Sequence, residues 1–236
     1  MKNLNLISFV GVDTNTNLNE LFEFNLKSRE CNFNCEFGVL YSQSQKSKRY
    51  PDYAFCFSFL RSVKIADMNT SIHLCGSESI DKFLLEDPPV IELCKMANRT
   101  QLNINIKNYP DYDLLAKNIL SVSTKHNITC ILQENATKKK FNEVLINYAL
   151  NNSNIHFLND SSGGFGREIT KVNKPNSNNF TGYAGGINPD NVKRIVNLIE
   201  SVNIDNIPYY IDMESGIRVD NNFSIDKCDE IINNLK

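Results

Sequence analysis

Two aspartates in the last third of the chain stand where a carboxylate can take part in acid–base chemistry. Asp160 closes the apolar run IHFLND, and Asp212 lies inside the run YYIDM. Partial burial raises the pKa of a carboxyl group and makes it a proton donor near neutral pH, and a charge inside a strand needs a partner or a ligand. Asp160 is therefore a candidate general acid, with a turn or capping aspartate as the alternative.

Small residues follow the same runs. The segments 158–166, 182–192 and 211–218 each combine the end of an apolar run with glycine. Glycine lets backbone N–H groups approach an anion closely, and a following helix N-terminus adds roughly half a positive charge. The sequence predicts a phosphate site bounded by Gly164, Gly185, Gly186 and Gly216.

The elements that must position these residues follow from an alternation along the chain. Short, β-branched runs ending in Gly, Asn or Asp alternate with longer stretches of helical spacing, which is typical of βα units. Eight such runs begin at Leu6, Glu36, Ser71, Gln101, Ile128, Asn154, Phe180 and Pro208. We therefore predict an α/β fold, a single (βα)₈ TIM barrel domain over residues 1–236, although periodicity alone also permits an open doubly wound sheet.

The stretches between the runs carry helix-start signals. Asp111, Thr137 and Ser224 each stand where a side-chain oxygen would cap a helix, and Pro189 is expected near a first turn. The connection 161–179 shows little helical spacing. A connection of that length without structure is usually functional or disordered.

Composition narrows the class of protein. The chain is 41% hydrophobic and 22% charged with a net charge of −2, so we expect neither a nucleic-acid nor a membrane partner. Seven cysteines lie mostly in apolar runs, which indicates reduced thiols and a cytoplasmic location. No second Cys or His pair follows Cys31 and Cys35, so no metal is expected. Monomer and homodimer both remain open.

The last third resembles the phosphoribosylanthranilate isomerases of tryptophan biosynthesis. LNDSSGGFG resembles the family's Leu-Asp-Ser strand end and Gly-Gly-Thr-Gly loop, AGGINPDNV its Ala-Gly-Gly-Leu-Asn-Pro-Glu-Asn-Val, and DMESGIR its Asp-Val-Ser-Ser-Gly-Val-Glu. The resemblance implies a barrel of the ribulose-phosphate-binding type that needs no cofactor. It implies these roles: Asp160 the acid, Asp212 and Arg49 contacts to the substrate, and Gly163, Gly164, Gly166, Gly185, Gly186, Ser215 and Gly216 the phosphate loops.

The first and fourth strands depart from the family. The family's Lys-Ile-Cys-Gly supplies a cysteine base, whereas SFVGVD places Val10 there, and Asn103 replaces a histidine. Valine exchanges no proton, so another group must be the base if the reaction is retained. Asp13 and Cys75, at or beyond strand ends, are the candidates, with a turn residue and a small core residue as the respective alternatives.

Two functions follow. The first is a phosphoribosylanthranilate isomerase-like enzyme that carries out the aldose–ketose (Amadori) isomerisation of a phosphorylated ribosylamine by acid–base catalysis. The second is a non-catalytic barrel that binds a small phosphorylated sugar and has lost the general base. Val10 favours the second, whereas Asp160 and Asp212 favour the first.

Overall fold

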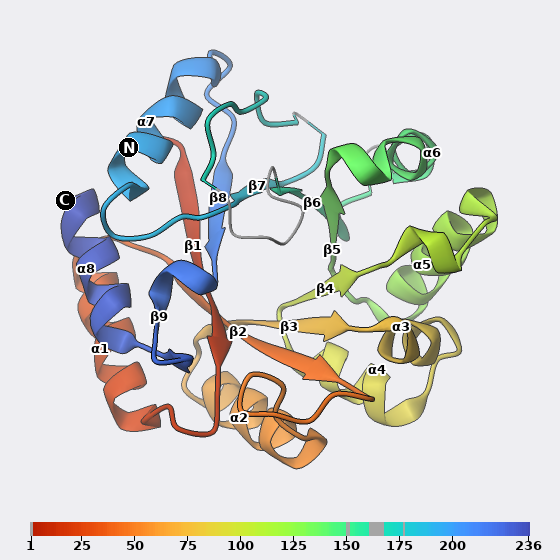
Figure 1. The fold of residues 1–236 in the computed structure, drawn as a ribbon, viewed down its shortest axis with the longest axis horizontal. Helices are drawn as coiled ribbons and strands as arrows, with labels where there is room; N and C mark the ends of the chain where they lie inside the picture. Colours follow the sequence, from red (N-terminus) through yellow and green to blue (C-terminus); the bar gives the residue numbers. More distant parts are fainter. Residues whose placement is uncertain (1, 150–151, 161–167, 177) are drawn as a thin grey trace.

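Eight parallel strands close into a barrel in the computed structural model, which describes residues 2–149, 152–160, 168–176 and 178–236 (Figure 1). The strands are β1 (Leu4–Val12), β2 (Cys35–Ser42), β3 (Asn69–Cys75), β4 (Arg99–Asn103), β5 (Cys130–Glu134), β6 (Ile155–Asp160), β7 (Thr181–Ala184) and β8 (Tyr209–Met213). Each strand pairs with the next, and β8 pairs with β1. The eight expected runs are therefore the eight strands, and the sheet is closed rather than open.

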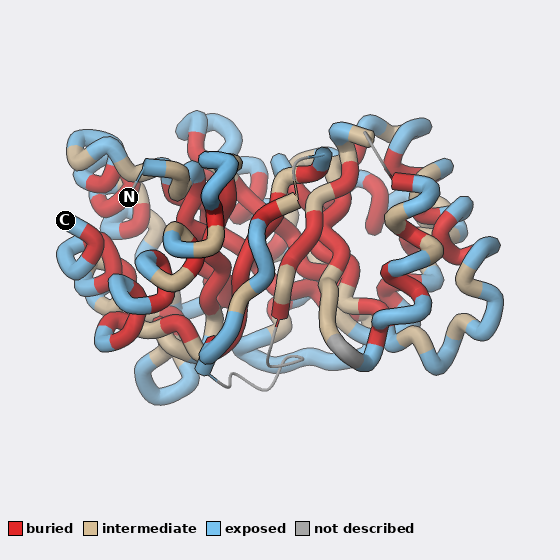
Figure 2. Tube along the Cα trace, turned by 90° about the horizontal axis from the view of Figure 1, so that it is seen from above, coloured by how far each residue is buried: buried red, intermediate tan, exposed pale blue. Residues whose placement is uncertain are grey.

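Side chains alternate between the barrel interior and the layer of helices, because successive residues of a strand face opposite ways. Inward-facing apolar side chains form a small cluster of their own: Leu6, Ile131, Leu158, Ala184 and Tyr210. Outward-facing ones join the helices in a larger core. Figure 2 shows the result, with buried strands in the middle and exposure concentrated on the outer turns.

Eight α-helices surround the strands in the described part of the chain. They are α1 (Leu18–Glu30), α2 (Tyr53–Ile65), α3 (Ser77–Leu84), α4 (Pro88–Met96), α5 (Tyr112–His126), α6 (Lys139–Ala149), α7 (Val192–Val202) and α8 (Ile225–Leu235). Asp111 Oδ1 accepts a hydrogen bond from Leu114 N at 2.9 Å, and Ser224 Oγ accepts one from Lys227 N at 3.3 Å, as expected of N-caps. No helix among the described residues is long and apolar enough to cross a membrane.

Two helix starts differ from expectation. Thr137 lies within a 3₁₀ turn, η2 (Ala136–Lys138), and the side chain of Asn135 caps that turn by accepting from Thr137 N at 3.1 Å. Pro189 precedes α7 by three residues, because the turn after β7 continues to Asn191 before the helix begins. Both differences move side chains into the loops at the carboxyl ends of the strands.

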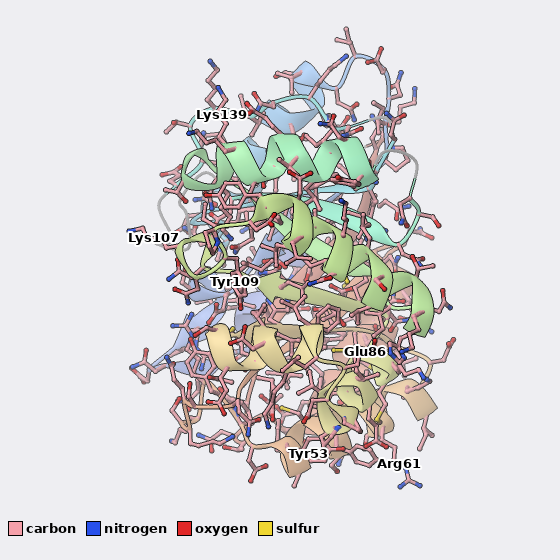
Figure 3. The ribbon with its side chains drawn as sticks, turned by 90° about the vertical axis from the view of Figure 1, so that its right-hand side faces the viewer. Tyr53, Arg61, Glu86, Lys107, Tyr109 and Lys139 are labelled. Atoms are coloured by element: carbon pink, nitrogen blue, oxygen red, sulfur yellow. The ribbon has the colours of Figure 1, made fainter. Side chains whose placement is uncertain are left out.

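The ring of helices is uneven. Two helices, α3 and α4, connect β3 to β4, whereas residues 168–176 and 178–180, before β7, form neither helix nor strand. In Figure 1 irregular chain lies between α6 and α7, and Figure 3 shows the right-hand side of that view, where α3, α5 and α6 lie one above another. After β8 the chain makes a short turn, η3 (Ser215–Ile217), and a hairpin of β9 (Arg218–Val219) and β10 (Asn222–Phe223) before α8.

A buried ion pair lies inside the barrel. Glu36 accepts hydrogen bonds from Arg99 Nε at 2.7 Å and Nη2 at 2.6 Å, and from Ser8 Oγ at 3.0 Å. The Arg99 guanidinium also lies over the ring of Tyr210, 4.1 Å from its centroid. The pair connects β2 and β4 across the interior and contacts β1 and β8.

Candidate functional site

A pocket of about 490 Å³ lies at the mouth where the carboxyl ends of the strands meet. In an α/β barrel this is the end at which ligands bind. Every strand contributes to its lining, including Val10, Leu40, Cys75, Asn103, Gln133, Asp160, Ala184 and Asp212. The mouth is therefore the candidate site.

The structure brings seven of the sequence-predicted residues into this pocket: Asp160, Cys75, Arg49, Asp212, Gly185, Gly186 and Ser215. Gly216 follows Ser215 in η3 but does not line the pocket. Gly163, Gly164 and Gly166 fall outside the residues that the structure describes. Asp13 is the one described catalytic candidate that lies elsewhere.

The loops after β7 and β8 approach each other closely. Gly185 and Gly186 have φ angles of +131° and +57°, values that L side chains rarely adopt. A Cβ atom at Gly216 would lie 2.0 Å from the carbonyl oxygen of Ile187, so only glycine permits this approach. The result is a wall of backbone and small side chains on one side of the pocket, the kind of surface that holds a phosphate.

Asp160 ends β6 inside the pocket and is 3% exposed. Lys138, from η2 after β5, lies beside it and is 8% exposed, and its Nζ donates to Gln133 Oε1 at 2.8 Å. Burial lowers the pKa of Lys138 to about 8, and the Asp160 carboxylate opposes this lowering. Lys138 was not among the candidates from the sequence, because the run KKK resembles an exposed helix start. The available signal was the position of Lys138 in the short connection that follows β5.

Asp212 faces the interior from β8 and is 7% exposed. Its Oδ1 is buried and has no hydrogen-bond partner among the described residues. Burial raises the pKa of this carboxyl to about 7, and the nearby carboxylates of Glu36 and Glu214 also raise it. The Ser8 hydroxyl and the Arg99 guanidinium lower it by less. The group thus exchanges a proton near neutral pH.

Arg49 crosses the mouth to the loop after β8. Its Nε lies 2.6 Å from Glu214 Oε1, and its Nη2 donates to Glu214 Oε2 at 3.0 Å. Glu214 thus binds the same Nε and Nη2 donors of Arg49 that a ligand carboxylate would bind. Arg218, also after β8, pairs with Asp13, with 3.1 Å between Nη2 and Oδ2.

Asp13 has a structural role in the turn after β1, in line with the alternative that the sequence left open. Its side chain is fully buried and accepts hydrogen bonds from Asn15 N, Thr16 Oγ1, Arg218 Nη2 and Phe223 N. The register of β1 shifts between Val10 and Val12, with Gly11 as the extra residue at φ +101°. Asp13 consequently fastens the β9–β10 hairpin and is set aside as a candidate base.

Cys75 does line the pocket, but its thiol is held in a neutral form. Its Sγ accepts from Asn103 Nδ2 at 3.1 Å and donates to the His73 carbonyl at 3.6 Å. Burial raises the pKa of the thiol to about 11, so the thiolate is scarce at neutral pH. His73 is also neutral there, because burial lowers its pKa to about 4.

Metal-binding side chains do not gather in the described part of the chain: it contains no group of three or more His, Cys, Asp or Glu that could hold an ion. Cys31 and Cys35, like the other five cysteines, are free.

Comparisons with known proteins place the fold. No known protein family has a model that matches the sequence, and no curated protein matches it. Among solved structures, phosphoribosyl anthranilate isomerase from Thermococcus kodakaraensis is similar with a TM-score of 0.58 and 12% identity, covering 99% of both chains. The chain shares the eight-stranded (βα)₈ TIM barrel fold of this structure.

Two further barrels are similar at the same level. 3-Hexulose-6-phosphate synthase from Salmonella typhimurium has a TM-score of 0.54 and 13% identity over 97% of each chain. Phospho-2-dehydro-3-deoxyheptonate aldolase from Thermotoga maritima has a TM-score of 0.59 and 14% identity, covering 99% of this chain and 68% of the other. At these identities the barrel fold alone is shared, and the choice of reaction must come from the pocket.

Proposed function

We propose that this barrel is an acid–base isomerase of a phosphorylated sugar, with a phosphorylated ribosylamine as its substrate class. One observation carries the proposal: two buried carboxylates, Asp160 and Asp212, line the same pocket as the Gly185–Gly186 loop and Ser215. A protein that only binds a phosphate gains nothing from carboxylates there, because they repel an anion. An isomerase needs groups that exchange protons beside an anchored substrate.

The reaction divides between the two sides of the pocket. The backbone of the β7 and β8 loops binds the phosphate and fixes the sugar, which turns remote binding energy into orientation. Asp160 protonates the ring oxygen, and the ring opens to an iminium at the first carbon. A base then removes the proton from the second carbon, and the ketose forms. Lys138 stabilises the carboxylate form of Asp160 after it has donated its proton.

The test is turnover of N-(5-phosphoribosyl)anthranilate, followed by the change in anthranilate fluorescence. We expect turnover by the wild type and a loss of roughly 100-fold or more in Asp160→Asn, the effect of removing a positioned acid. Asp229→Asn, at a half-buried carboxylate of α8 that pairs with Lys27, makes the same chemical change outside the pocket and is the control.

A non-catalytic sugar-phosphate-binding barrel is the second candidate, because Val10 lines the pocket on β1 and exchanges no proton. Calorimetry with ribose 5-phosphate distinguishes the two functions. Tight binding that is unaffected by Asp160→Asn, without turnover, would establish the binder and defeat the isomerase.

A further inference from the structure

The site as described holds an acid on β6 but no proton acceptor on β1. Val10 occupies the inward-facing position of β1 that lines the pocket, one alternation beyond Ser8. The proposed isomerisation requires a group that removes a proton from carbon, so the acceptor must stand on another strand.

Asp212 stands on the neighbouring strand. In the barrel register it pairs with Ser8 of β1 on one side and with Ala184 of β7 on the other, and its side chain lines the pocket. Asp212 is therefore adjacent to β1, where Val10 supplies no proton acceptor, and to the glycine loop that follows Ala184. Its Oδ1 is buried without a hydrogen-bond partner among the described residues, although the Ser8 hydroxyl interacts with the carboxyl group, so Asp212 keeps hydrogen-bonding capacity beside the pocket.

We infer that Asp212 is the catalytic base of this barrel and takes the function that a residue of β1 cannot supply. The inference rests on the proposed isomerase function. The Asp212 carboxylate removes the proton from the second carbon, and the C–H electron pair becomes the bond between the first and second carbons. The electrons of the C=N bond return to nitrogen and neutralise the iminium. The same carboxyl then protonates the first carbon, which restores the Asp212 carboxylate. The second-carbon hydroxyl loses its proton to solvent and yields the ketose, and solvent returns one proton to Asp160, which had given its own to the ring oxygen.

The charges around Asp212 suit this function. Ser8 from β1, Glu36 from β2, Arg99 from β4 and Glu214 after β8 face it, and Ala184 from β7 is apolar. Glu36 is already neutralised by Arg99, with 2.6 Å between Oε1 and Nη2. Burial keeps the pKa of Asp212 near 7, so the carboxylate is available at neutral pH and is basic enough to accept a proton from carbon.

Two other titratable groups of the pocket, Glu214 and Cys75, are less suited to accept a proton. Both carboxylate oxygens of Glu214 bind Arg49. The Cys75 sulfur is a thiol, with a pKa raised to about 11, and accepts from Asn103. Asp212 is thus the described carboxylate of the pocket that combines burial with an oxygen lacking a partner.

The experiment compares kcat/KM against pH for the wild type, Asp212→Asn and Asp212→Glu with N-(5-phosphoribosyl)anthranilate. The wild-type rate should rise with pH through a midpoint near 7, as the carboxyl loses its proton. Asp212→Asn should lose roughly 100-fold or more and lack that rise. Asp212→Glu should recover part of the rate with a displaced midpoint. Calorimetric affinity for ribose 5-phosphate should change no more than a few-fold in either variant.

Asp229→Asn is again the matched control, because it lies outside the pocket, and it should keep the wild-type rate and profile. Circular dichroism melting verifies that each variant is folded. If the wild type is active and Asp212→Asn keeps both its rate and its rise with pH, or if only Cys75→Ser abolishes turnover, the base is not Asp212 although the isomerase function stands. A wild type without turnover would overturn the function, and the assignment of the base with it.

Discussion

A carboxyl group with a raised pKa affects stability as well as reactivity. Asp212 has a pKa of about 7 when folded against an ordinary value of 3.8, because it is buried. The folded state therefore holds this proton more tightly than the unfolded state. The resulting stabilisation is complete below about pH 4 and is lost as the pH rises to about 7.

The Asp212→Asn variant removes this dependence. Its free energy of unfolding, relative to the wild type, should increase between pH 4 and pH 8 by on the order of 2 to 4 kcal/mol. Urea unfolding at each pH measures the difference. A constant difference across this range would mean that the folded pKa of Asp212 is ordinary.

Lys138 and Asp160 offer a second test at single residues. The Asp160 carboxylate raises the pKa of Lys138, which burial has lowered to about 8. In Asp160→Asn the pKa of Lys138 should therefore fall further, and more of the amine should be neutral at pH 7.5. NMR titration of the lysine side-chain signals measures this shift, and exposed Lys2 serves as the internal reference. An unchanged or higher pKa of Lys138 in this variant would mean that Asp160 does not interact electrostatically with the Lys138 amine.

At the scale of elements, the approach of the β7 and β8 loops depends on Gly216. A methyl group there would collide with the Ile187 carbonyl, so Gly216→Ala must push the two loops apart. We expect a loss of about 1 to 3 kcal/mol in the free energy of unfolding and weaker binding of inorganic phosphate.

Gly76→Ala is the comparison. Gly76 has a φ of +83°, but the atom nearest to an added Cβ is 3.6 Å away. This variant should cost about 1 to 2 kcal/mol through backbone strain and leave phosphate affinity unchanged. Equal phosphate affinity in both variants would argue against a phosphate site between the β7 and β8 loops.

The Arg49–Glu214 pair joins the loop after β2 to the loop after β8. The Arg49 side chain is 51% exposed, so solvent screens the pair, and its net contribution should be small. Glu214→Gln should change the free energy of unfolding by less than about 1 kcal/mol in urea titrations. A loss well above that would make the pair a structural clamp and leave Arg49 unsuited to receiving a ligand.

The positions of the strands and of the β1 bulge explain which pocket residues could be located from the sequence. Asp160, Cys75 and Asp212 were recognisable because parallel strands bring their carboxyl ends to one mouth. Asp13 was misjudged because the bulge at Gly11 alters the direction of the chain, and a single glycine in a strand does not reveal which way. The β9–β10 hairpin, which receives Asp13, is too short for a periodic signal.

Across the whole molecule, the sequence predicted the eight strands because each is an unbroken, β-branched run bounded by turn residues. It did not predict the polar barrel interior. Ser8, Glu36, Arg99 and Asp212 stand on four different strands, and only barrel closure brings them together. The irregular backbone of residues 168–176 and 178–180 falls within the connection that the sequence marked as lacking helical periodicity.

The buried Glu36–Arg99 pair tests how the closed barrel is stabilised. The Glu36 side chain is 1% exposed and the Arg99 side chain 6%. Burial raises the pKa of Glu36, but the Arg99 guanidinium lowers it, and the net shift is downward. Glu36→Gln leaves the guanidinium without its counter-charge inside the barrel and should cost about 3 to 5 kcal/mol. Combining Glu36→Gln with Arg99→Met removes both charges and should cost less than Glu36→Gln alone, because no uncompensated ion remains. Chemical denaturation of the single and double variants measures the coupling, and additive losses would mean that the two charges stabilise the barrel independently.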